Sequence, residues 1–229
     1  MNSVTNNRFV CACNLPIGTC RNFNHPLKME ALVGPFVEGW ALGKYSGKLE
    51  DKSTQTHTQY GYLKYGQLVH DFKYASFKLN QSEGEVWRRS IMDQLKISVD
   101  YFLEGYFPKA IRPFDTVVPV PSSSDSSETI QNKIAIHLRE KGLNEAQGTI
   151  KVDNRGHIST KNIPGLQGRL KSVGTRYGLG AFNELQSARG LLLIDDVYET
   201  GATLRTTVSL LNQVVPEIPK YFLTIAYIR

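Results

Sequence analysis

Apolar positions recur at two different periods beyond residue 85, and these periods predict alternating strands and helices. Short continuous apolar runs predict buried strands at 116–121, 149–152, 190–197 and 221–228. Apolar residues at three- and four-residue steps predict amphipathic helices over 87–106, 130–138 and 203–213. Because strands and helices alternate, we expect the second half of the chain to be α/β.

The first sixty residues have a different pattern, with few periodic apolar positions. Glycines are frequent between residues 34 and 53, and Tyr60, Tyr62 and Tyr65 follow in a β-favouring run. A small β-containing region is therefore expected before about residue 66. We expect an N-terminal, cysteine-containing arm over residues 1–58 and a main domain over residues 59–229.

The composition is that of a folded, mildly basic protein. The 229 residues include 27 Lys and Arg against 21 Asp and Glu, a net charge of +6, and 41% are hydrophobic. These values exclude a disordered chain, a collagen and a pure coiled coil, and the positive charge favours polyanionic partners. The longest aliphatic run, Leu191 to Ile194, is far shorter than the ~20 apolar residues of a membrane span. The polar N-terminus also lacks a signal-peptide apolar region, so the expected location is cytoplasmic.

The three cysteines lie in one N-terminal window. Cys11, Cys13 and Cys20 are followed by His25, a set that could bind zinc through three thiolates and one imidazole. The spacing of Cys11 and Cys13 is closer than the usual first pair of a zinc site. The alternative is a set of reduced thiols in an irregular arm, because a clustered odd number of cysteines argues against a disulfide framework.

The segment from Leu191 to Leu204 is the clearest candidate for a chemical site. It places four aliphatic residues before Asp195 and Asp196, which is the pattern of a buried parallel strand with two acids at its carboxyl end. Open α/β sheets bind ligands at this end. Neighbouring carboxylates on a strand point to opposite sides, which suits two hydroxyls, or one hydroxyl and a metal-bound water.

The small residues after the acids predict a phosphate site. Thr200 to Thr203 stand where the next helix begins, so backbone N–H groups and two hydroxyls would face outward together. The chain contains neither a Walker P-loop nor a dinucleotide-binding glycine motif. The alternative is an ordinary strand–turn–helix in which the threonines cap the helix and the aspartates face water.

The run of four aliphatics, two acids, a hydrophobe and a T-G-x-T turn resembles the phosphoribosyl pyrophosphate (PRPP) binding motif of type I phosphoribosyltransferases. Further similarity to the ComF-like branch lies in three stretches, which are Leu63 to Tyr74, Val118 to Ser122 and Gln167 to Phe182. The resemblance covers roughly residues 60 to 229. It implies a twisted parallel sheet flanked by helices, with the N-terminal arm as a small hood.

The resemblance also implies a ligand and the residues that contact it. The ligand is Mg²⁺ with PRPP, or a 5′-phosphorylated nucleoside, and Asp195 and Asp196 bind the ribose hydroxyls as the catalytic pair. The remaining implied binding residues are Ser122, Ser123, Val197, Tyr198, Glu199, Thr200, Gly201, Ala202 and Thr203. ComF-like proteins also often bind zinc through an N-terminal cysteine cluster.

The implied activity is an enzymatic one, a phosphoribosyltransferase (glycosyltransferase) of nucleotide metabolism that releases pyrophosphate as it glycosylates a nitrogenous acceptor. ComF-like proteins usually carry a basic residue after the strand at 116–121, whereas this chain has serines and Glu128 there. Without that cation, a non-catalytic nucleotide sensor is the alternative, because the departing pyrophosphate needs its charge neutralised. The sequence leaves homo- or hetero-oligomers open.

The stretch from Lys151 to Arg189 carries an excess of five positive charges and six glycines. It predicts a largely irregular loop that could close over a polyanion. A solvated basic loop with no single task is an alternative. Nucleic acid is a third candidate partner for this stretch, as in a DNA-associated accessory protein, although aromatic residues that could stack on bases are sparse there.

Overall fold

The computed structural model describes residues 9–11, 27–29, 36–49, 59–62, 64–78, 81–122, 128–153, 163 and 166–228. The strands are β1 (Phe9–Cys11), β2 (Leu27–Met29), β3 (Phe36–Lys44), β4 (Ser46–Leu49), β5 (Gln59–Tyr62), β6 (Thr116–Pro119), β7 (Asn144–Glu145), β8 (Ile150–Val152), β9 (Tyr177–Leu179), β10 (Leu191–Tyr198) and β11 (Lys220–Tyr227). The helices are α1 (Lys64–Lys78), α2 (Gln81–Tyr106), α3 (Ile130–Glu140), α4 (Leu166–Gly174) and α5 (Ala202–Val214). Two short 3₁₀ helices span Lys109–Ile111 and Asn183–Leu185.

A central sheet with the order β1-β2-β3-β11-β10-β6-β7 organises the fold. Five neighbouring strands of this sheet are parallel to one another, namely β3, β11, β10, β6 and β7. At the β3 edge, β2 and then β1 are added in antiparallel orientation. Two-stranded ribbons, β4 with β5 and β8 with β9, lie outside this sheet. The expected α/β class with a helix-flanked parallel sheet is therefore confirmed.

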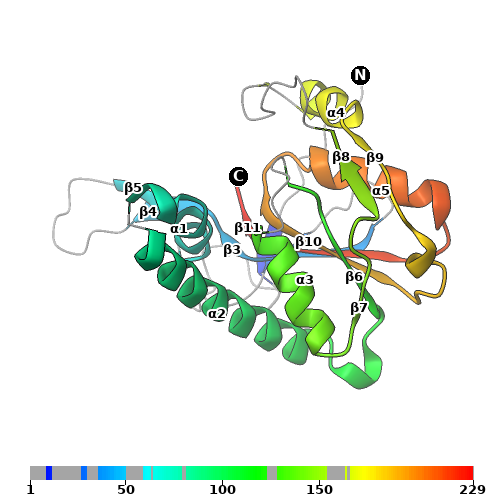
Figure 1. Ribbon diagram of the computed structural model, residues 1–229, viewed down its shortest axis with the longest axis horizontal. Helices are drawn as coiled ribbons and strands as arrows, with labels where there is room; N and C mark the ends of the chain where they lie inside the picture. Colours follow the sequence, from blue (N-terminus) through cyan, green and yellow to red (C-terminus); the bar gives the residue numbers. More distant parts are fainter. Residues whose placement is uncertain are drawn as a thin grey trace.

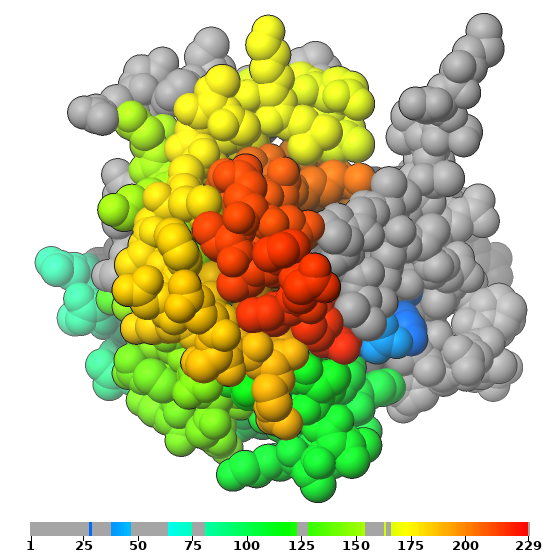
Figure 2. Space-filling model, turned by 90° about the vertical axis from the view of Figure 1, so that its right-hand side faces the viewer, coloured from blue at the N-terminus to red at the C-terminus, as the bar shows by residue number. Residues whose placement is uncertain are grey.

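Helices cover both faces of the sheet (Figure 1). On the first face, residues of α1, α2 and α3 form one hydrophobic core with Leu192 and Ile194 of β10. On the second face, α4 and α5 pack against Leu191 and Leu193 of the same strand, and Figure 2 shows α4 above α5 on this side of the molecule. Alternate side chains of one buried strand thus enter two separate cores, as a doubly covered parallel sheet requires.

The structure differs from the local expectations at three places. The apolar spacing that predicts the helix over 87–106 begins at Trp87 and ends at Tyr106, but these two residues are 48% and 38% exposed. The buried apolar positions of α2 run from Ile91 to Leu103. Tyr65 belongs to α1 rather than to a strand. Within the basic stretch, where a loop is expected, the described residues include α4 and the β8–β9 ribbon.

The strand β3 lies before the boundary that the sequence predicts at residue 58. It nevertheless pairs with β11 along its length, so the central sheet includes residues on both sides of that boundary. Gly39 makes this close pairing possible, because a Cβ atom there would lie 2.0 Å from the ring of Phe222. No described helix is long and apolar enough to cross a bilayer.

Candidate functional site

The site lies where the chain connections change direction at the carboxyl ends of two neighbouring strands. From β6 the chain passes through α3 on the first face to β7, whereas from β10 it passes through α5 on the second face to β11. Such a reversal opens a crevice, the usual ligand position in open α/β sheets. A cavity of about 430 Å³ lies there, lined by Pro121 and Ser122 after β6 and by the chain from Asp195 to Leu204.

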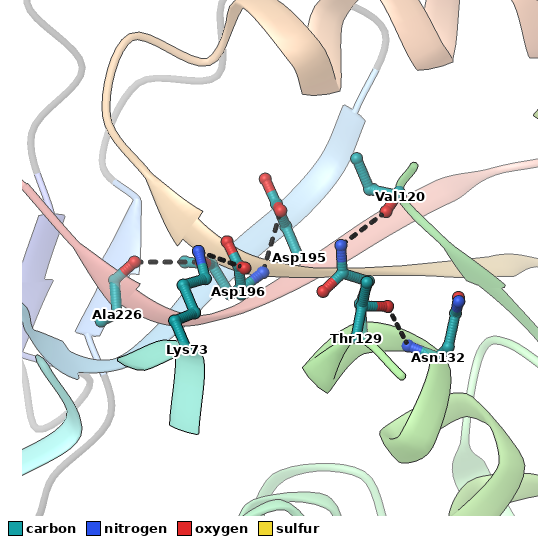
Figure 3. Close-up of polar contacts among 9 residues, drawn as sticks. Lys73, Val120, Thr129, Asn132, Asp195, Asp196 and Ala226 are labelled. Carbon is teal, nitrogen blue, oxygen red and sulfur yellow. Dashed lines mark hydrogen bonds and ion pairs between the residues drawn. The ribbon is translucent and has the colours of Figure 1, made fainter. Parts of the chain in front are cut away.

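The two acids stand at the end of β10 and serve opposite faces. The Asp196 carboxylate forms an ion pair with Lys73 of α1, with 2.6 Å between Lys73 Nζ and Asp196 Oδ2. Asp195 points to the other side of the strand (Figure 3), and its charge acts on Tyr177 of β9. Its Oδ1 atom accepts a hydrogen bond from the Asp196 backbone N–H at 2.9 Å. The predicted opposition of the two carboxylates is confirmed.

Asp195 has a strongly perturbed acidity. Burial, and then the neighbouring charge of Asp196, raise the pKa of Asp195 to about 8, against smaller opposing effects of the Asp196 amide and Lys73. The raised pKa favours the protonated form of this carboxyl group in the ligand-free protein. A protonated carboxyl group can donate a hydrogen bond and accept others, which suits a polyhydroxylated ligand.

The turn after β10 forms the N-terminus of α5. Gly201 is the N-cap residue and has a left-handed conformation, with φ of 72°, and the Thr200 hydroxyl accepts a hydrogen bond from the Ala202 N–H at 3.4 Å. A Cβ atom on Gly201 would lie 2.7 Å from the Tyr198 hydroxyl oxygen. The turn brings backbone N–H groups, hydroxyls and the positive end of a helix to the cavity wall, which is a suitable site for an anion.

Three cations from outside this segment line the same cavity. They are Lys73 of α1, Arg169 of α4 and Arg176, which precedes β9. Arg169 pairs with Glu199 at 2.5 Å and donates from Nε to the Ile163 carbonyl oxygen at 2.9 Å. Arg176 is only 6% exposed. Cations held in partly buried positions next to a helix N-terminus favour an anionic ligand.

Two further polar side chains fix the loop after β6. The Tyr177 hydroxyl donates to the Pro121 carbonyl oxygen at 2.9 Å, and burial together with the Asp195 charge raises the pKa of Tyr177 to about 12. Gln131 of α3 is 1% exposed and donates from Nε2 to the Val120 carbonyl oxygen at 3.1 Å. The Oε1 atom of Gln131 is buried and has no hydrogen-bond partner among the described residues.

The structure brings most of the residues proposed from the sequence to one cavity. Ser122, Asp195, Asp196 and the chain from Val197 to Thr203 all line it. Two of these residues also support the protein core. Val197 packs against the first-face core, and Tyr198 is 6% exposed and stacks on Phe222 with ring centroids 5.8 Å apart. Ser123 lies outside the described residues.

Sequence reasoning missed the residues that come from distant parts of the chain. In the sequence, Lys73 lies within the ComF-like stretch with no role assigned to it, and Arg169 and Arg176 contribute only to the general positive charge of the stretch 151–189. Gln131 and Tyr177 gave no signal, because a polar residue on a helix or ribbon looks the same whether it faces solvent or a cavity.

The proposed zinc ligands lie where the structure gives no description of side chains. Cys13, Cys20 and His25 fall outside the described residues, and Cys11 is described only as the last residue of β1. Among the side chains that are described, no group of three His, Cys, Asp or Glu residues could hold a metal ion. The zinc site stays a prediction.

The basic stretch from 151 to 189 does not form one continuous cationic surface in its described part. Arg169 and Arg176 line the cavity, whereas Arg189 pairs with Asp115 at 3.0 Å outside it. Two of the arginines of this basic stretch therefore line the same cavity as the acid pair.

No family model and no curated protein matches this chain.

Proposed function

We propose that this protein is a ComF-like phosphoribosyltransferase-fold protein that binds Mg²⁺-PRPP, or a 5′-phosphorylated nucleoside, in the cavity at the end of β10. We further propose that it transfers the phosphoribosyl group to a nitrogenous acceptor and releases pyrophosphate. One observation carries the proposal. The acid pair Asp195–Asp196 and the helix N-terminus at Thr200–Thr203 line one cavity, at the crevice between β6 and β10.

The 5′-phosphate fits the start of α5. Thr200 and Thr203 supply hydroxyls, the first turn of the helix supplies backbone N–H groups, and Arg169 and Arg176 supply charge from the neighbouring α4–β9 segment. A dianion at this position gains from the helix dipole and from charge-assisted hydrogen bonds. Glu199 then shares Arg169 with the ligand.

The ribose fits the acid pair. Asp195, with its raised pKa, can donate a hydrogen bond as well as accept one, and Asp196 is oriented by Lys73. The two carboxyl groups also suit Mg²⁺, which typically binds one or two protein carboxylates together with substrate phosphates and water. When bound, Mg²⁺ would neutralise charge on the departing pyrophosphate.

The leaving group determines whether the site turns over. Residues 121–131 contain no Lys or Arg, so the loop after β6 brings no cation to the pyrophosphate. Lys73, Arg169 and Arg176 are the cations that line the described cavity. Their positions support catalysis, whereas the uncharged loop supports the second candidate, a protein that binds the nucleotide as a sensor without reacting it.

Calorimetric titration with Mg²⁺-PRPP tests the binding proposal. We expect saturable binding by the wild type and a loss of at least tenfold in affinity in the double variant Asp195→Asn/Asp196→Asn. Asp93→Asn on the exposed side of α2 is the matched control, because it makes the same chemical change away from the cavity. A wild type that fails to bind Mg²⁺-PRPP would refute the proposal.

A pyrophosphate-release screen over nitrogenous acceptors then separates the enzyme from the sensor. Release that depends on the acceptor and disappears in the aspartate variant supports transfer. Binding of Mg²⁺-PRPP without release for any acceptor supports the sensor. Binding to DNA that falls steeply with salt and is unchanged in the aspartate variant would instead support a nucleic-acid accessory role.

A further inference from the structure

The residues that line the cavity come from both faces of the sheet, and we divide them by that origin into two halves. The second-face half consists of Arg169, Val173, Arg176 and Tyr177 together with the start of α5. The other half, here called the aromatic half, consists of Tyr45, Lys73, Tyr74, Val197 and Ile228. In the proposed function the phosphate and ribose occupy the second-face half and the acid pair, and the pyrophosphate faces the loop after β6 at Pro121 and Ser122, so the aromatic half is left for the acceptor.

The aromatic half is built by the docking of α1 onto the end of β3. Gly66 allows this docking, because a Cβ atom there would lie 1.7 Å from the Tyr45 carbonyl oxygen. Gly43 allows it from the strand side, since its Cβ would lie 2.7 Å from the ring of Tyr65. Lys73 is seven residues after Gly66, hence two turns further along the same side of the helix. The docking therefore directs Lys73 to the end of the sheet.

Lys73 is a cation with donors to spare. Its ammonium group has three N–H donors, and the ion pair with Asp196 uses one of them. The side chain is 36% exposed and lines the cavity next to Tyr74, which is itself 38% exposed. Flat aromatic faces and an apolar wall favour a planar ring, and an ammonium group beside them favours a negative charge on that ring.

We propose that the aromatic half binds the acceptor of the transfer reaction, and that this acceptor is a planar nitrogenous ring carrying a carboxylate that Lys73 recognises. The inference rests on the proposed function. The ring nitrogen forms a bond to the anomeric carbon of PRPP while the bond from that carbon to the pyrophosphate oxygen breaks. Pyrophosphate leaves with the electron pair, and any proton on the attacking nitrogen passes to water.

Matched pairs of rings test the recognition of the carboxylate. We would titrate each ring separately and compare orotate with uracil, and nicotinate with nicotinamide. The protein would be saturated either with Mg²⁺-PRPP or with Mg²⁺ and ribose 5-phosphate, which has no pyrophosphate to lose and cannot react. We expect at least one carboxylated ring to bind about ten- to a hundredfold more tightly than its uncharged partner, the range for a hydrogen bond between charged groups. Equal binding within both pairs, or no binding of any ring, would overturn the inference.

Variants of Lys73 then locate the recognition. Lys73→Met should bring the affinity ratio within a pair close to one, whereas Lys73→Arg should keep most of the ratio because it keeps the charge. Lys109→Met is the control, since Lys109 is an exposed lysine away from the cavity. If the affinity ratio within a pair is unchanged in Lys73→Met, the role of Lys73 is overturned. If Lys73→Met is unfolded, the ratios in Lys73→Arg and in the wild type are compared instead, and loss of the ratio in Lys73→Arg would overturn recognition by charge.

The two proposals fail in different ways. A wild type that does not bind Mg²⁺-PRPP overturns the proposed function and the acceptor assignment together. A wild type that binds Mg²⁺-PRPP but shows no preference for a carboxylated ring overturns the acceptor assignment alone. Tyr74→Leu should weaken both members of a pair by a similar factor, because it removes the flat surface and keeps the charge.

Discussion

Gly201 is the position at which a single methyl group should disturb both the fold and the phosphate site. Replacement by Ala keeps a left-handed φ of 72°, which costs about 1–2 kcal/mol for a residue with a Cβ atom. The new Cβ would also lie 2.7 Å from the Tyr198 hydroxyl oxygen and 2.9 Å from two of its ring atoms. Tyr198 is buried against Phe222 and cannot simply swing away. Overpacking of this kind costs about 1–3 kcal/mol.

The expected loss in the free energy of unfolding for Gly201→Ala is therefore about 2–5 kcal/mol. Urea unfolding followed by circular dichroism measures it, and an unchanged m-value would show that the change lies in stability. Gly148→Ala is a close control, because Gly148 has φ of 73° and nothing within 4 Å of its Cβ position. It should lose only the conformational part, about 1–2 kcal/mol. Equal losses in the two variants would refute the steric argument.

Three further predictions concern the surroundings of the cavity. Between about pH 4 and pH 8 the folded protein holds a proton on Asp195 that the unfolded chain releases, so the free energy of unfolding should fall as pH rises. Urea titrations at pH 5 and pH 8.5 should show this fall. The variant Asp195→Asn should remove most of the difference between the two pH values. Tyr177→Phe deprives the Pro121 carbonyl of a donor and should cost about 1–2 kcal/mol in the same assay. Gly66→Ala should lower the melting temperature by several degrees, because its Cβ would overlap the Tyr45 carbonyl oxygen; an unchanged melting temperature would contradict the docking of α1 on β3.

The second half of the fold could be predicted from the sequence because its elements are set by local period. The buried strand at β10, the helix α5 and the last strand β11 lie within one or two residues of their predicted ranges. Elsewhere a local signal competed with another one. In α4, Leu166, Leu170 and Val173 have helical spacing, but the neighbouring glycines favoured a loop. At Tyr65, aromatic β-propensity masked the start of a helix.

The candidate site was predictable only where it is continuous in sequence. The acids and the threonine turn follow one strand, so their order along the chain is also their order in space. Lys73, Gln131 and Arg169 reach the cavity from three separate helices. Their arrival depends on how α1, α3 and α4 dock on the sheet, and a single sequence carries no local pattern for such docking.

The phase of β10 links the core to the chemistry of the site. Leu191 and Leu193 enter the second-face core, and Leu192 and Ile194 enter the first-face core. The same alternation continues into the acids, so Asp195 acts on Tyr177 at the second-face half while Asp196 pairs with Lys73 at the aromatic half. A shift of one residue would exchange the two acids as well as invert the buried faces. The stretch from Leu191 to Asp196 thus fixes which acid serves which half of the cavity, because the same period also satisfies both cores. Beyond the acids the order reverses, since Val197 packs against the first-face core and Tyr198 belongs to the second-face core.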